Sequence, residues 1–417
     1  MSQSSMSAVP NDPNDQQTPP KTPEETPKET PQKILKAIAA NFVVSDRPAD
    51  NISSVEPLGN GNINSTFLVT TSDAASQYSG QRSGQHSGQR FVLQRINTQV
   101  FTQPEQVIQN MVLLNEHLSQ QSEKAQKSLD HRRWETPQVL PTTQGKNFWR
   151  DEQGHYWRAI TFVEEAQVFD TVNSCAHARE VGYGLAMFHS LISTLPAERL
   201  ADTLEGFHIT PQYLAHYQQV RQQVRQQAEL SAPTAAVRYC LNFIEQRQAW
   251  AHVLEKAKAA GHLQLRPIHG DPKVNNMMLG ADGKAVSLID LDTIKPGLVH
   301  YDIGDCLRSG CNPLGEETED WQAVVFDTDL AKAMLEGYLS LAKDFLTEQD
   351  YDYLYDAIRL IAFELGLRFF TDHLAGNVYF KVTHPTHNLH RALVQFKLTE
   401  SIENQADTLK AIIENLR

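Results

Sequence analysis

A short stretch in the second half of the chain carries side chains whose types and spacing suit catalysis. It reads His269-Gly270-Asp271-Pro272-Lys273-Val274-Asn275-Asn276, and Leu288-Ile289-Asp290-Leu291-Asp292 follows after a short gap. Transfer of a phosphoryl group from ATP needs one carboxylate to take the proton of an acceptor hydroxyl. It also needs an amide and a second carboxylate to hold Mg²⁺ on the phosphates. The five-residue step from Asp271 to Asn276 matches a kinase catalytic loop.

These residues receive separate predicted roles. We expect Asp271 to act as the catalytic base and Lys273 to add positive charge at the transferring phosphate, with ATP and Mg²⁺ as cofactors. Asn276 and Asp290 are the expected metal ligands; Asn275 competes with Asn276, but the five-residue offset favours Asn276. A turn, a cap or a strand end explains each residue taken alone, whereas the ordered set favours a kinase-like site.

Elements that must position these residues are visible around them. The apolar run at residues 285–289 is expected to be a buried strand that delivers Asp290. Nearer the N-terminus, strands at residues 55–58 and 66–70 flank a glycine turn, and backbone N–H groups can approach phosphates there because no Cβ intrudes. The candidate nucleotide contacts in this turn are Gly59, Gly61 and Asn62, although such a turn is often only a hairpin.

The strand at residues 91–96 falls where kinases place the lysine that pairs with the α- and β-phosphates. This chain has Gln94 and Arg95 instead. Adjacent residues point to opposite faces of a strand, so only one of the two can meet the nucleotide. Gln94 has the better register, whereas Arg95 keeps the positive charge, and we favour Arg95.

A helix expected at residues 104–118 offers Glu105 and Glu116 as carboxylate partners for that cation, and the sequence does not choose between them. Strands at residues 148–150 and 156–163 follow and lead into a hinge. Hinge backbone atoms commonly hydrogen-bond adenine in kinases, so the candidate adenine contacts are Phe162, Val163 and Glu164.

Helical spacing dominates after residue 175. Asp302 stands ahead of a helical run, where an aspartate can cap the helix or hold the backbone amides of a loop. Related kinases use such an aspartate to brace the catalytic loop, so Asp302 and His269 are expected to be structural. Arg368 and Asp372 are four residues apart and therefore share one helical face. They form either a salt bridge or part of an acceptor pocket, where a carboxylate accepts hydroxyl hydrogens and an arginine donates to oxygens.

The catalytic stretch with Ile289-Asp290 resembles the aminoglycoside phosphotransferase and choline kinase superfamily of small-molecule kinases. Within it, three longer stretches are similar to N-acetylhexosamine 1-kinases: residues 91–97, residues 291–297 with 301–308, and residues 368–372 with 379–380. The resemblance implies an α+β, bilobal protein-kinase-like fold, with an N-terminal antiparallel sheet plus helix and a mainly helical C-terminal lobe.

The resemblance also implies an acceptor, namely the anomeric hydroxyl of N-acetylglucosamine or N-acetylgalactosamine. The residues expected to bind it are Asp271, Asp292, Arg308, Arg368 and Asp372. Where that family is expected to have Gly-Asp, this chain has Gly376-Asn377. An aminoglycoside or another amino alcohol such as choline is an alternative acceptor, and an acidic run at residues 316–320 suits a cationic one. A pseudokinase that binds without turnover is a third interpretation.

Composition sets the remaining expectations. Residues 1–31 have few large apolar side chains and are expected to be a disordered tail. An N-lobe at 32–164, with a low-complexity insertion at 71–90, and a C-lobe at 165–417 follow. The net charge of −13 argues against nucleic acid, and no apolar run suits a membrane span. Without a signal peptide or paired CxxC cysteines, we expect a cytoplasmic protein whose partners are ATP and a small-molecule sugar; monomer and dimer both stay open.

Overall fold

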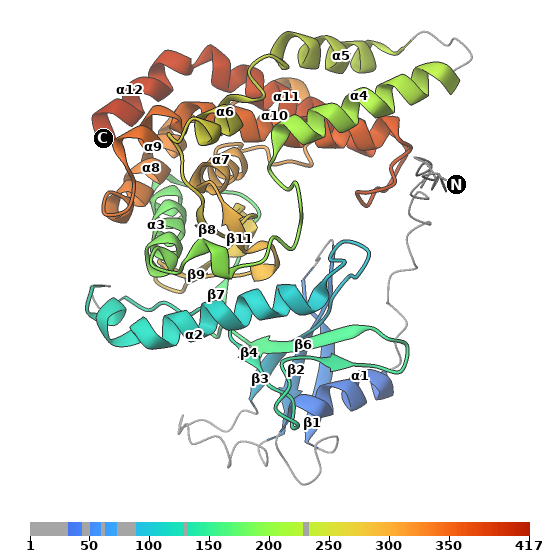
Figure 1. Cartoon of the computed structure of the whole chain (residues 1–417), viewed down its shortest axis with the longest axis vertical. Helices are drawn as coiled ribbons and strands as arrows, with labels where there is room; N and C mark the ends of the chain where they lie inside the picture. The colour runs from blue at the N-terminus through green and yellow to red at the C-terminus, as the bar shows by residue number, and fades with distance from the viewer. Residues whose placement is uncertain (1–31, 44–50, 60–62, 73–88, 129–131, 228–232) are drawn as a thin grey trace, which may run out of the picture.

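The computed structural model of this 417-residue chain describes residues 32–43, 51–59, 63–72, 89–128, 132–227 and 233–417 (Figure 1). For residues 121–128 it describes the backbone alone. The predicted tail, Gly61 and Asn62, and most of the predicted insertion at 71–90 lie outside these ranges.

The N-terminal lobe is built on an antiparallel sheet. Its strands run in the order β1-β2-β3-β6-β4, with β5 paired to β6 at the side. Their bounds are β1 Ile52–Pro57, β2 Ser65–Thr71, β3 Arg90–Arg95, β4 Val139–Leu140, β5 Trp149–Arg150 and β6 Tyr156–Thr161. The alternating apolar residues of β2 and β3, such as Phe67 and Leu93, form a buried cluster with Leu35 and Ile38 of helix α1 (Gln32–Ala39).

Helix α2 (Pro104–Ser128) lies between this sheet and the helical lobe (Figure 1). Its first turns bury Val107 and Ile108 with Ile96, whereas Met111 and Leu114 belong to the large core of the helical lobe. The helix therefore contacts both lobes, because its first turns pack against the N-terminal lobe and its next turns pack in the core of the helical lobe. The helix is longer than the stretch predicted at 104–118.

The C-terminal lobe is mainly helical and carries two small antiparallel sheets. The helices are α3 Cys175–Ile192, α4 Thr210–Gln227, α5 Ala235–Arg247, α6 Val253–Ala259, α7 Val299–Gly310, α8 Thr328–Ala342, α9 Glu348–Asp352, α10 Leu354–Leu374, α11 His387–Asn404 and α12 Ala406–Leu416. The strands are β7 Ala166–Gln167, β8 Arg266–Ile268, β9 Met277–Gly280, β10 Ala285–Leu288 and β11 Lys295–Gly297.

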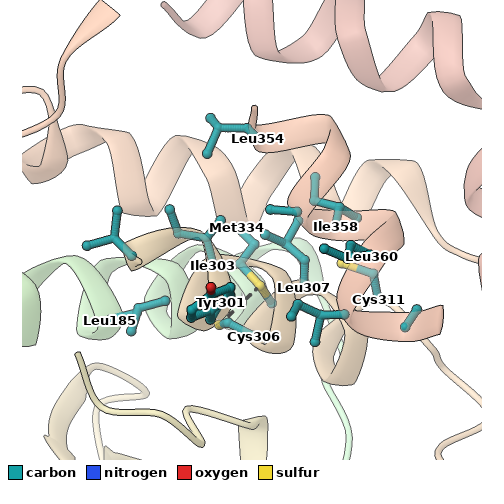
Figure 2. Packing of buried hydrophobic residues seen from close by; sticks show 14 of the residues in the cluster. Leu185, Tyr301, Ile303, Cys306, Leu307, Cys311, Met334, Leu354, Ile358 and Leu360 are labelled. Atoms are coloured by element: carbon teal, nitrogen blue, oxygen red, sulfur yellow. Dashed lines mark hydrogen bonds between the residues drawn. The ribbon is translucent and has the colours of Figure 1, made fainter. Parts of the chain in front are cut away.

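Close helix crossings fix the middle of this lobe. A Cβ at Gly182 of α3 would lie 1.9 Å from the Met334 carbonyl oxygen of α8, so only glycine permits this approach. Buried helix α7 packs nearby, where the Cys306 sulfur lies 3.6 Å from the Met334 sulfur (Figure 2). Such packing holds α7, and with it Asp302, rigidly beneath the catalytic loop.

The predicted fold class is confirmed: an antiparallel sheet lobe precedes a helical lobe. The region after residue 175, in which helical spacing was predicted to dominate, contains α3 to α12. In the described part of the chain, no helix has both the length and the apolar character that crossing a membrane requires.

Candidate functional site

The catalytic stretch forms a loop between β8 and β9, with a short 3₁₀ turn at Val274–Asn276. The Lys273 ammonium lies 2.9 Å from a carboxylate oxygen of Asp271. The Asn276 amide nitrogen donates to the Asp271 carbonyl oxygen over 2.7 Å. Because the nitrogen faces that carbonyl, the amide oxygen of Asn276 points to the other side, where it can serve as a ligand.

Asp302 braces this loop from α7. Its carboxylate accepts the backbone N–H groups of His269 (2.7 Å) and Gly270 (2.8 Å) and the Nε2–H of His189 (2.9 Å). Although burial alone would raise it, the pKa of Asp302 is lowered because His189 and these donors favour the charged form. The sequence predicts this bracing role for Asp302.

His269 links the loop to the strand that precedes Asp290. Its Nε2–H donates to the Ile289 carbonyl oxygen (2.9 Å), and its Nδ1 accepts the Asp271 backbone N–H (3.2 Å). One donor and one acceptor define a neutral imidazole, and burial lowers the pKa of His269. The next residue, Gly270, has φ +88°, and a Cβ there would lie 2.6 Å from the Thr293 carbonyl oxygen.

Asp290 follows β10 in the left-handed region at φ 65°. Part of the residue is exposed, yet the protein groups packed around its carboxyl restrict the contact of that carboxyl with water. This loss of hydration, together with the carboxylates of Asp292 and Asp271, raises the pKa of Asp290 to about 7. A cation in this position would relieve the repulsion among the three carboxylates.

The donor set suits Mg²⁺. A carboxylate from Asp290 and an amide oxygen from Asn276 are hard oxygen ligands. Among the described residues, no three His, Cys, Asp or Glu side chains are grouped closely enough to hold a metal by themselves. A metal at this position therefore needs further oxygens, which nucleotide phosphates supply in kinases.

Lys273 controls the charge of Asp271. Burial favours the neutral carboxyl, but the charge and hydrogen bond of Lys273, together with weaker contributions such as the charge of Arg308, lower the pKa of Asp271. The Asp271 carboxylate in turn raises the pKa of Lys273. The pair is therefore ionised at neutral pH, as a base and a phosphate-binding cation require.

The sheet places Gln94 and Arg95 on opposite faces of β3. Arg95 shares a strand face with Phe91 and Leu93, which pack toward α1. Gln94 lies on the opposite face, where its Oε1 accepts two hydrogen bonds from Arg158 of β6 (3.0 and 2.7 Å). The sheet thus turns Arg95 away from α2 and Gln94 toward it. This geometry favours Gln94, and which of the two residues meets the nucleotide stays a prediction.

Neither predicted glutamate of α2 contacts Gln94 or Arg158. Glu105 accepts a hydrogen bond from the Tyr156 hydroxyl (3.1 Å), and Glu116 is exposed. The carboxylate that meets Arg158 is Asp292, which is buried and forms a salt bridge with it. Asp292 was predicted to contact the acceptor, but its carboxylate is engaged by Arg158 and by Asn64.

The predicted adenine strip lies at the end of β6. Val163 is buried in a small apolar cluster with Met278 and Val286. The ring of Phe162 lies under the Arg90 guanidinium at 4.7 Å, and the carbonyl oxygen of Glu164 accepts from Arg133 (2.6 Å). Gly59, with φ +69°, is the one predicted turn residue that falls within the described ranges.

On the acceptor side, Arg308 and Arg368 occupy different settings. The Arg308 guanidinium is buried and pairs with Asp305 (2.8 Å) and Glu316 (2.9 Å). The Arg368 guanidinium is partly exposed and lies 5.0–5.4 Å from three aromatic rings, those of Phe207, Tyr213 and Phe380.

The carboxylate of Asp372, which was predicted to bind the acceptor, is engaged by donors of the protein itself. Its carboxylate accepts the backbone N–H groups of Val378, Tyr379 and Phe380 (2.8–2.9 Å) and the Asn388 amide (2.8 Å). Four donors occupy its two oxygens, and the residue is buried. We therefore assign Asp372 to folding the loop that places Phe380 against Arg368. Sequence reasoning did not take account of the loop after the helix, which folds back so that its N–H groups reach the Asp372 carboxylate.

Sequence reasoning also missed His208. This buried residue has φ 65°; its Nε2 lies 2.7 Å from the Gly270 carbonyl oxygen and its Nδ1 2.9 Å from Glu364. Both neighbours are acceptors, so both ring nitrogens donate and the imidazole is protonated. His208 and Glu364 are 156 residues apart, and no local pattern marks the pair.

Comparisons with known proteins agree with this geometry. The sequence profile described as the phosphotransferase enzyme family matches residues 54–335, more than half of the chain. The fold is similar to that of an aminoglycoside phosphotransferase from Alicyclobacillus acidocaldarius, with TM-score 0.59, 16% identity, and coverage of 91% of this chain and 96% of that one.

Two further solved structures share the fold. A microcompartment-associated aminopropanol kinase gives TM-score 0.56 at 15% identity, with coverage of 90% of this chain and 98% of that one. A choline kinase from Cryptosporidium parvum gives TM-score 0.53 at 13% identity, with coverage of 92% and 99%. On the extent of the family match, the chain belongs to the phosphotransferase enzyme family.

Proposed function

We propose that this phosphotransferase moves the γ-phosphoryl group of ATP to a small-molecule hydroxyl, namely the anomeric hydroxyl of an N-acetylhexosamine. The convergence of Asp271, Lys273, Asn276 and Asp290 around one loop carries the proposal of ATP-dependent transfer. The same set makes a pseudokinase the weaker interpretation.

In this proposal, Asp271 accepts the hydrogen bond of the acceptor hydroxyl and takes its proton as the oxygen attacks. Lys273 keeps Asp271 ionised and adds positive charge near the transferring group. Asn276 and Asp290 hold Mg²⁺, which, when bound, neutralises charge on the phosphate oxygens. The protein itself contributes position and charge rather than a covalent intermediate.

The surroundings of Arg368 support a sugar acceptor over a cationic one. Choline-like ligands are recognised by aromatic rings placed around a cation. Here three such rings already surround the protein's own Arg368 guanidinium. Burial opposes the charge of Arg368, but Tyr213, Tyr379, Glu364 and Asp271 raise its pKa. An acceptor ammonium placed beside this permanent cation would be repelled, whereas a carbonyl or ring oxygen would receive its hydrogen bonds.

The acidic run at residues 316–320 provides less negative charge than its sequence suggests. Glu316 is paired with Arg308 at 2.9 Å. Glu317 is paired with Arg391 at 2.5 Å and with His387 at 2.7 Å. With these two carboxylates matched by protein cations, the run is a weak site for a polycationic aminoglycoside.

A second candidate is an amino-alcohol acceptor, including an aminoglycoside. The observation in its favour is the fold itself, which is shared with proteins named as aminoglycoside, aminopropanol and choline kinases. At 13–16% identity these likenesses concern the fold alone, so the local chemistry around Arg368 decides our preference.

An ATP-consumption screen with Mg²⁺ separates these possibilities. The acceptors are N-acetylhexosamines, plain hexoses, amino sugars, aminoglycosides and choline. Formation of a sugar 1-phosphate from an N-acetylhexosamine would support the proposal. Turnover with an amino alcohol alone would establish the second candidate, and ATP binding without turnover on any acceptor would favour the pseudokinase.

A further inference from the structure

Arg158 is among the most deeply buried charged residues of the chain, with 1% of its surface exposed. A guanidinium is costly to bury unless its N–H groups and charge are matched. Its Nε and Nη2 donate to Gln94, its Nη2 also pairs with Asp292, and its Nη1 lies 3.0 Å from the Met111 sulfur, a weak acceptor. The strong acceptors therefore gather on one edge of the guanidinium, and the Nη1 edge is weakly matched.

The position of Arg158 in the sheet is informative. Arg158 of β6 pairs directly with Gln94 of β3, so the two side chains stand side by side on the sheet face toward α2. Gln94 occupies the strand position at which the nucleotide-binding lysine is expected. The positive charge thus lies one strand away from that position, and the glutamine that replaces the lysine holds it in place.

The carboxylate partner has also moved. In kinases the lysine pairs with a glutamate of the helix after its strand, but here α2 presents Met111 to Arg158. The partner is Asp292, two residues after the proposed metal ligand Asp290. Asp292 also accepts a hydrogen bond from Asn64, whose Oδ1 accepts the Asn97 backbone N–H at 2.9 Å.

We infer that Arg158 supplies the cation of the nucleotide-phosphate site from β6, in place of a lysine on β3, with Gln94 and Asp292 as the residues that position it. This inference rests on the proposed function, since it assumes that ATP binds between the sheet and the catalytic loop. Arg158 forms a salt bridge with Asp292, which stands two residues after the proposed metal ligand Asp290. This contact ties Arg158 to the segment that carries the proposed metal ligand.

The test compares binding of Mg·ATP and of adenosine, which has the base and ribose but no phosphate, by calorimetry on the full chain. Arg158→Gln should weaken Mg·ATP binding by about tenfold to a hundredfold and leave adenosine binding unchanged. A merely structural role would weaken both ligands equally, and thermal unfolding reports whether the variant is folded.

A relocated charge controls for loss of folding. The double variant Gln94→Lys with Arg158→Gln moves the cation to residue 94 of β3. This residue is the direct cross-strand partner of residue 158 and lies beside Asp292. It should recover most of the lost Mg·ATP affinity. The inference is overturned if Arg158→Gln binds Mg·ATP as tightly as the wild type, or if both ligands weaken together and the relocated lysine recovers nothing. If the wild type binds no ATP, the proposed function itself fails.

Discussion

The buried pair of His208 and Glu364 makes a prediction about stability that can be worked through in full. Because both ring nitrogens of His208 face acceptors, the imidazole is charged in the folded protein. Burial alone would lower the pKa of His208, but the Glu364 carboxylate, with Asp305 and the Gly270 carbonyl, raises it. We choose His208→Asn as the perturbation because asparagine tolerates the φ of 65° at this residue.

His208→Asn leaves Glu364 buried with the Thr210 hydroxyl, at 2.6 Å, as its remaining hydrogen-bond donor. Removing one partner of a buried ion pair costs about 3–5 kcal/mol of unfolding free energy. The double variant His208→Asn with Glu364→Gln removes the unpaired charge as well. It should lose about 1–3 kcal/mol, because the Gly270 carbonyl still lacks its donor.

The sign of the pH dependence follows from the raised pKa of His208. Its stabilising contribution is fully present below the pKa of about 6.5 that an unfolded histidine has, and it is lost as the pH rises through the higher folded pKa. Urea unfolding at about pH 6 and at about pH 9 measures this contribution. The wild type should lose more stability than the double variant between these two pH values. A charged pair at this position would be refuted if the wild type and the double variant lost the same stability between the two pH values. It would also be refuted if the double variant were no more stable than His208→Asn.

Three further perturbations test other parts of the site. Arg368→Ala should raise the KM of the sugar acceptor by about tenfold or more and leave the KM of ATP unchanged, as steady-state kinetics would show. Asp372→Ala leaves four donors unmatched and should lower the free energy of unfolding by about 2–4 kcal/mol in a urea titration, whereas exposed Asp352→Ala should change it little. Because the pKa of Asp290 is about 7, Mg·ATP binding below that pH should release a proton, seen as a buffer-dependent calorimetric enthalpy that Asp290→Asn abolishes.

The local parts of the fold and site follow from the sequence because their signals are local. The catalytic loop is a run of eight residues in which each role is set by a short offset, and the apolar run at residues 285–289 predicts a buried strand that ends just before Asp290. The structure brings Asp271, Lys273, Asn276 and Asp290 together. Their catalytic and metal-binding roles stay predictions.

The remaining parts depend on pairings between distant residues. The strand pattern puts Gln94 and Arg95 on opposite faces but does not say which face is turned toward α2. The packing of α1 on one face of the sheet decides this. Nothing in the sequence around Arg158 distinguishes it from other strand residues. Its role follows from its pairing with Gln94, which lies 64 residues earlier in the chain. Helical spacing puts Asp372 on the same face as Arg368 and predicts a shared role, yet the hydrogen-bond partners of Asp372 lie on the loop that follows the helix.

The measurement that tests the central claim most directly is phosphoryl transfer by the wild type and by Asp271→Asn, with Mg·ATP and an N-acetylhexosamine. The account predicts a sugar 1-phosphate from the wild type. It also predicts that Asp271→Asn loses turnover by about 10²–10⁴-fold, because the base is gone, while ATP binding and thermal unfolding change little. Turnover in Asp271→Asn close to that of the wild type would contradict the assignment of Asp271 as the base, and with it the proposed mechanism.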